Sequence, residues 1–179
     1  MLHSPHRPPK FEQEFATSRG RPIVVDGRTV HLTFGTPVAW ATARVTLRFV
    51  AYVRRPVQGV CLDMSEGDLL INGLQASGIT LWADTTPPLV HLEILKPAAV
   101  PATLNVWNCW RDERGVRHSW TGNAGFLLTS PTPTSHRFAC SDGLGPADFS
   151  NLVLTVDIEP RATVLGLGPF TPPAHASRR

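Results

Sequence analysis

Three of the five tryptophans of this 179-residue chain lie between residues 104 and 125, together with one cysteine and one histidine. Trp107, Cys109 and Trp110 stand on one strand of a predicted hairpin, and His118 and Trp120 stand on the other. A cysteine beside a histidine can act as a nucleophile with its base. A tryptophan ring beside polar groups can stack on a sugar while its neighbours bind the hydroxyls. The segment is therefore a candidate for catalysis or for ligand binding.

Which of these side chains meet depends on the hairpin loop, predicted as the four residues Asp112–Gly115. With that loop Trp110 faces Arg117 and Cys109 faces His118, while alternate residues point to opposite sides. The side expected in the core carries Trp107, Cys109, His118 and Trp120. The side expected in solvent carries Asn108, Trp110, Arg117 and Ser119. A loop one residue longer or shorter would overturn this assignment, because a one-residue slip moves every side chain to the other face.

Two more tryptophans, Trp40 and Trp82, are each in step with charged and hydroxyl residues of their strands. Such rings either form a binding platform or lie in strands covered on both faces, since tryptophan is usually well buried. In Gly122–Gly125 the two glycines around Asn123 either bring backbone N–H groups to a ligand or form a bulge. The candidate ligand-binding residues are Trp40, Trp82, Asn108, Trp110, Arg117 and Asn123.

The sequence offers few candidates for other catalytic sites or for metal binding. The chain holds no GxSxG, HExxH or GxxxxGK[ST] motif, and Cys140 with His136 is a second cysteine–histidine candidate. The loop 141–149 resembles a calcium loop, because Asp142 and Asp148 stand six residues apart across two glycines. It lacks the intermediate oxygen ligands and the bidentate glutamate of tight calcium sites. We therefore expect a structural turn there, with no metal and no cofactor.

The elements that must position these residues are strands. Apolar and polar residues alternate through most of residues 21–159, and no window of twelve residues shows the apolar stripe of a helix. Asp26-Gly27 between two apolar runs predicts a tight hairpin turn, and 43–53 predicts a half-buried strand. Further strands are predicted at 57–63, 68–71, 78–83, 89–95, 102–111, 116–121, 124–129, 136–140 and 151–158. About ten short strands without helices favour one all-β domain, an antiparallel β-sandwich of jelly-roll or immunoglobulin-like topology.

The two flanks differ from this domain in composition. Residues 1–20 predict a flexible N-terminal arm, and residues 160–179 predict a flexible Pro/Gly-rich C-terminal tail. The net charge of +3 comes from residues 1–21 and 161–179, since ten basic and twelve acidic side chains give residues 22–160 a net charge of −2. The domain is therefore not expected to present a basic face to nucleic acid.

The sequence also predicts where the protein resides. No run of residues approaches the ~18 apolar residues of a membrane span. The first ten residues lack the apolar core of a secretory signal. Three cysteines without a CxxC motif favour free thiols, with one disulfide and a spare thiol as the alternative. We expect a soluble cytoplasmic protein without a membrane partner.

Four short motifs follow one another along the second half of the chain: WNxWR at 107–111, WxGNAG at 120–125, CSDG at 140–143 and DFxxLV at 148–153. Their series resembles a pattern of small uncharacterised bacterial proteins and covers roughly residues 60–158. The resemblance implies a bacterial source. It carries no known activity and so assigns no functional residue.

Together these residues favour a non-catalytic binding or interaction module, whose partner is a glycan or a protein held by exposed tryptophans. One alternative is a small enzyme that uses Cys109 with His118, or the loop with Asp142 and Asp148. The other alternative is a structural subunit of a larger assembly, an oligomer in which the proline-rich flanks reach neighbouring subunits.

Overall fold

The computed structural model describes residues 10–161 of the chain. Within them lie one short helix, α1 (Phe11–Ser18), and fourteen strands whose pairings are all antiparallel. The strands are β1 (Ile23–Val25), β2 (Arg28–Val30), β3 (Phe34–Val38), β4 (Thr42–Tyr52), β5 (Val57–Met64), β6 (Asp68–Ile71), β7 (Leu74–Ala76), β8 (Gly78–Trp82), β9 (Leu89–Leu95), β10 (Ala102–Arg111), β11 (Arg117–His118), β12 (Asn123–Thr132), β13 (Ser135–Gly143) and β14 (Leu152–Pro160). The all-β prediction is confirmed, and the predicted count of about ten strands is too low.

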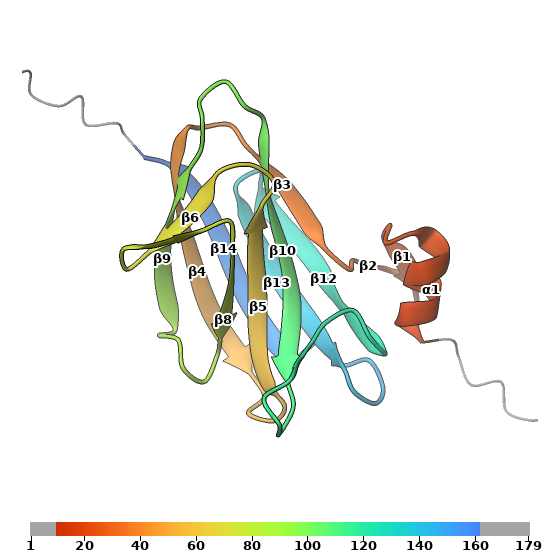
Figure 1. Ribbon diagram of the computed structural model, residues 1–179. Helices are drawn as coiled ribbons and strands as arrows, with labels where there is room; N and C mark the ends of the chain where they lie inside the picture. The colour runs from red at the N-terminus through yellow and green to blue at the C-terminus, as the bar shows by residue number, and fades with distance from the viewer. Residues whose placement is uncertain (1–9, 162–179) are drawn as a thin grey trace, which may run out of the picture.

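These strands form three sheets. β1 and β2 make a hairpin of their own, in which Asp26 and Gly27 have φ of 49° and 73°, as the predicted tight turn requires. The five-stranded sheet has the order β11-β10-β5-β8, with β3 also paired to β10. The seven-stranded sheet has the order β12-β13-β14-β4-β9-β6-β7. In Figure 1 the two larger sheets lie one behind the other as two layers.

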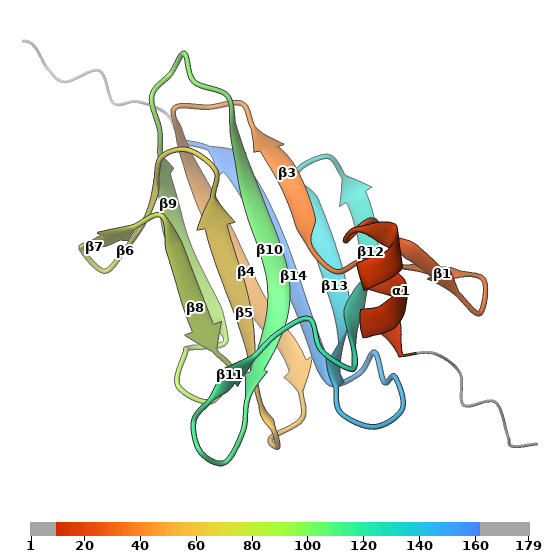
Figure 2. The ribbon, with the colours of Figure 1, turned by 45° about the vertical axis from the view of Figure 1, so that its right-hand side comes forward.

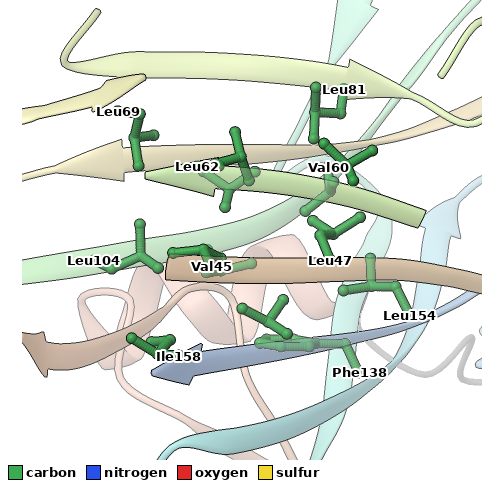
Figure 3. Close-up of a cluster of buried hydrophobic side chains, with 14 of the residues drawn as sticks. Val45, Leu47, Val60, Leu62, Leu69, Leu81, Leu104, Phe138, Leu154 and Ile158 are labelled. Carbon is green, nitrogen blue, oxygen red and sulfur yellow. The ribbon is translucent and has the colours of Figure 1, made fainter. Parts of the chain in front are cut away.

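One hydrophobic core lies between the two larger sheets and contains side chains from both. Val60 and Leu62 of β5 point inward from the five-stranded sheet, and Val45 and Leu47 of β4 point inward from the seven-stranded sheet (Figure 3). Alternate residues point the other way, because side chains alternate along a strand. The outer face of the five-stranded sheet therefore carries the odd-numbered residues of β5 and β10 and the even-numbered residues of β8.

The prediction of a flexible arm is wrong for residues 11–18, which form α1 on the side of the molecule next to β12 (Figure 2). Phe11 and Phe15 are four residues apart, so they share one helix face, and both are buried in a second cluster with Ile23 and Val30. Two buried apolar residues in eight are too few to show as a stripe in a twelve-residue window. Arg19, with φ of 58°, ends the helix in the left-handed conformation.

Residues 1–9 of the predicted arm lie outside the described residues, as does the predicted tail from residue 162 onward. Pro160 ends β14 and does not begin the tail. In residues 10–161 no helix is long and apolar enough to cross a membrane.

Candidate functional site

The hairpin of β10 and β11 has a five-residue loop, so the predicted facing of its side chains is wrong. β10 and β11 pair Trp110 with His118, where the sequence predicted Trp110 opposite Arg117. The Asp112 carboxylate accepts hydrogen bonds from the backbone N–H groups of Arg114 and Val116, both at 2.9 Å. These bonds hold Val116 inside the turn, which lengthens the loop by one residue.

The longer loop exchanges the roles of two tryptophans. Trp110, predicted in solvent, is 2% exposed, and its ring stacks on the His118 ring with centroids 5.8 Å apart. Trp120, predicted in the core, is 47% exposed; it has φ of 63° and packs against Trp107 outside the regular strand pairing. His118 points to the same side of the sheet as Trp110, and Cys109 points to the opposite side. The proposed Cys109–His118 catalytic pair is therefore not formed.

Trp110 and His118 instead line a groove of about 1140 Å³ where β5 begins and β10 ends. We call it the end groove. Its other walls include Arg55 before β5, Asp112 in the hairpin loop and Leu144 after β13. His118 Nε2 lies 3.1 Å from Asp112 Oδ2, and this hydrogen bond is the main cause that lowers the pKa of the Asp112 carboxyl. The groove therefore combines a stacked aromatic base with polar groups of both charges.

A buried polar network ties the two layers together near this groove. Gln58 Nε2 donates a hydrogen bond to Asp142 Oδ2 at 3.0 Å, and Asn108 Nδ2 donates one to the Ser141 carbonyl at 2.8 Å. All four residues are buried, where polar groups need partners. Asn108, a predicted ligand-binding residue, is thus a link between β10 and β13. Gln58 Oε1 is a buried atom for which the described residues provide no hydrogen-bond donor.

Asp142 and Asp148, the calcium candidates, are each engaged in their own loop. Asp142 Oδ1 accepts a hydrogen bond from the Leu144 N–H at 3.0 Å. Asp148 Oδ1 accepts hydrogen bonds from the hydroxyl and the N–H of Ser150, which lower the pKa of the Asp148 carboxyl. Among the described residues no group of three or more His, Cys, Asp or Glu could hold a metal ion. That the loop needs no calcium stays a prediction.

The other candidate residues lie in different places. Trp40, in the connection from β3 to β4, packs against the main core. The Asn123 side chain accepts a hydrogen bond from the Phe11 N–H and donates one to the Gly145 carbonyl, so it fastens α1 to the loop after β13. Trp82 and Arg117 lie at the outer face of the five-stranded sheet, where the Arg117 guanidinium donates to Thr80 Oγ1 at 3.0 Å. The six predicted residues do not form one surface.

Near Trp82 and Arg117 the structure brings together two cysteines that sequence reasoning did not connect. Cys61 on β5 and Cys109 on β10 are diagonal neighbours, because Cys109 is paired with Gly59, two residues before Cys61. Both are buried although they lie on an outer face. A Cβ at Gly59 would come within 2.6 Å of the Trp82 ring and 3.0 Å of Cys109 Sγ. Glycine at this position therefore lets the indole and the thiol lie over the strand.

The two thiols differ in their tendency to ionise. A hydrogen bond from Cys109, helped by Thr80 and Arg117, lowers the pKa of Cys61 to about 7 against the opposing effect of burial. The same hydrogen bond and burial raise the pKa of Cys109.

The strands that carry the two cysteines, β5 and β10, were each predicted from their own alternation of apolar and polar residues. The register of β5 against β10 was not predictable, because it joins segments far apart in the chain.

The other cysteine–histidine candidate also belongs to structural surroundings. Cys140 lies in the main core, where burial raises the pKa of its thiol. His136 packs its ring on Phe34 with centroids 4.7 Å apart, and its Nδ1 lies 2.8 Å from Ser130 Oγ. Both side chains are therefore held by packing, although the described residues provide no hydrogen-bond partner for the buried His136 Nε2.

Comparisons with known proteins found no relative of this chain. No protein-family model, no curated protein and no solved structure matches the chain, and the resemblance to bacterial proteins over residues 60–158 stays a prediction.

Proposed function

We propose that this protein is a non-catalytic protein-binding module whose partner occupies the end groove. The observation that carries the proposal is the groove of about 1140 Å³ together with the apolar side chains exposed around it. Leu144 lines the groove, and Val116 follows Gly115, which also lines it. Both side chains are exposed. Exposed apolar groups gathered at a concave site are typical of interaction surfaces.

The groove fits a segment of protein better than a sugar. A sugar platform needs a flat aromatic ring open to solvent, and the ring at the base of the groove is covered by the His118 stack. The rim carries Arg55 and Glu113, whose opposite charges suit the mixed polar groups of a peptide. The polar network of Gln58 and Asp142 supports a preformed site, which reduces the entropy cost of binding.

We also propose a fold for the module, a cellular location and a source. The scaffold is a β-sandwich, supported by the single core that both larger sheets share. A cytoplasmic location is supported by three cysteines with free thiols. A bacterial source rests on the motif series alone.

Selection from a random peptide library, run in parallel with a glycan array, tests the proposed function. We expect peptides whose binding changes tryptophan fluorescence and is weakened at least about tenfold by Leu144→Asp. Val24→Asp is the matched control, because Val24 is also exposed and apolar but lies on β1 outside the groove. Glycan binding that Leu144→Asp abolishes would replace the peptide by a sugar as the ligand. Peptide binding that both variants leave unchanged would contradict the end groove as the site.

A further inference from the structure

The thiols of Cys61 and Cys109 are placed for chemistry with each other. They lie on neighbouring strands and on the same face as diagonal neighbours, and each thiol is the largest influence on the pKa of the other. Cys61 also lines a hollow of about 250 Å³ on the outer face, together with Asp63, Thr80, Trp107 and Arg117. Thr80 Oγ1 lies 3.5 Å from Cys61 Sγ and accepts the hydrogen bond from Arg117. Of the two cysteines, Cys61 lines this hollow and Cys109 does not.

We propose that Cys61 and Cys109 form a redox-active dithiol that a small hydroperoxide oxidises to a disulfide. In the first step the Cys61 thiolate attacks the peroxide. An S–O bond forms, the O–O bond breaks, and the leaving oxygen takes up a proton as water or alcohol. In the second step the Cys109 sulfur attacks the Cys61 sulfur of the sulfenic acid. The S–S bond forms, the S–O bond breaks, and the hydroxyl leaves with the Cys109 proton as water. Two thiols lose two electrons and the peroxide gains them.

The surroundings of the two cysteines indicate which sulfur attacks the peroxide and which one resolves the sulfenic acid. Cys61 is the attacking sulfur because it faces the hollow and has Arg117 beside it, and a thiolate is the reactive form. Cys109 is the resolving sulfur because it is buried away from the hollow, next to Gly59, and the neighbouring Cys61 and burial raise its pKa. Asp63 is the acidic group in the hollow and opposes Arg117. Cys140 lies on β13 of the other sheet, in the main core.

The sheet geometry predicts that the disulfide is reversible. Diagonal neighbours in a regular antiparallel pair lie roughly 7–8 Å apart. Disulfides usually join Cα atoms about 4.4–6.8 Å apart. The two strands must therefore move slightly together, and a bridge formed under such strain is more easily reduced.

Thiol counting on the full chain tests the proposal. The folded, reduced protein is treated with hydrogen peroxide and then denatured, and its free thiols are counted. We expect the three thiols to fall to one, a Cys61–Cys109 disulfide in the peptide map, and full recovery with dithiothreitol. The oxidation rate should rise with pH through about 7, and Arg117→Gln should slow it about threefold or more at pH 7.

Three serine variants separate the roles. Cys109→Ser should leave a sulfenic acid on Cys61 that dimedone captures, Cys61→Ser should not react, and Cys140→Ser should form the disulfide as the wild type does. Three thiols remaining after peroxide treatment of the wild type would overturn the proposal. Loss of Cys140 at the same rate as Cys61 would do so too, because it would show oxidation of an unfolded chain. The wild-type peptide map decides even where a variant fails to fold.

Discussion

Trp110 and His118 stand directly opposite each other on β10 and β11, and their rings stack at a centroid distance of 5.8 Å. This pairing buries Trp110 and places His118 at the end groove, where it meets Asp112. It depends on the Asp112 carboxylate, which binds the N–H groups of Arg114 and Val116 and so makes the loop five residues long. One side chain in a turn thus decides which aromatic rings face solvent.

We predict that Trp110→Ala lowers the free energy of unfolding by about 3–5 kcal/mol, as expected for truncation of a buried aromatic. Trp120→Ala should cost less than about 1.5 kcal/mol, because the Trp120 side chain is half exposed. Urea unfolding of both variants measures the difference. Equal losses would mean that the two rings are buried to the same degree, against the five-residue loop.

Gly143 and Gly145 allow the cost of a steric collision to be separated from the cost of a positive φ angle. Both have positive φ, of 85° and 67°. A Cβ at Gly143 would collide with the Thr121 carbonyl oxygen and come 2.8 Å from the Trp110 ring, whereas a Cβ at Gly145 would meet no atom within 4 Å. We expect Gly145→Ala to cost about 1–2 kcal/mol, from φ alone. Gly143→Ala should cost more than about 3 kcal/mol, because the collision adds to that strain. Similar unfolding midpoints for the two variants would be the contrary result.

Phe15 tests whether α1 is docked on the domain. The Phe15 side chain is buried against the β1–β2 hairpin cluster, so Phe15→Ala should release the helix and cost about 3 kcal/mol. Thr17, exposed on the same helix, is the control, and Thr17→Ala should change stability by less than about 0.5 kcal/mol. Hydrogen exchange of residues 11–18 gives the readout. If the wild-type amides already exchange as fast as in the Phe15→Ala variant, the helix is not docked.

We predict that the buried His136 side chain makes the protein less stable in mild acid. Burial lowers the pKa of His136 below its ordinary value of 6.5, so the folded chain resists protonation. The unfolded chain binds the proton first as the pH falls. The stabilising contribution is therefore complete above about pH 6.5 and is lost as the pH falls toward the lower folded pKa. His136→Gln should flatten the decrease in urea midpoint between pH 8 and pH 5.

Burial also lowers the pKa of His31, so the variant with both histidines replaced should show a flatter profile than either single variant. A pH profile of His136→Gln that superimposes on that of the wild type would assign the acid sensitivity to other groups.

Alternation along single segments was sufficient to predict most strands. The predicted strands 68–71, 89–95 and 102–111 coincide with β6, β9 and β10, because the period of two is a local property of a half-buried strand. The Asp26-Gly27 turn was also predictable, since its positive φ angles are a property of those two residues. Helix α1 was not, because the eight residues between Phe11 and Ser18 hold only two buried apolar positions.

The sequence by itself thus determined the all-β class, the bounds of most strands and the residue types available for chemistry. Only the tertiary structure decided which of those residues meet. The end groove depends on the Asp112 turn, and the contact between Cys61 and Cys109 depends on the register of β5 against β10. The physical reason is that register between distant strands comes from packing of the whole core. Each strand's own pattern is compatible with several registers.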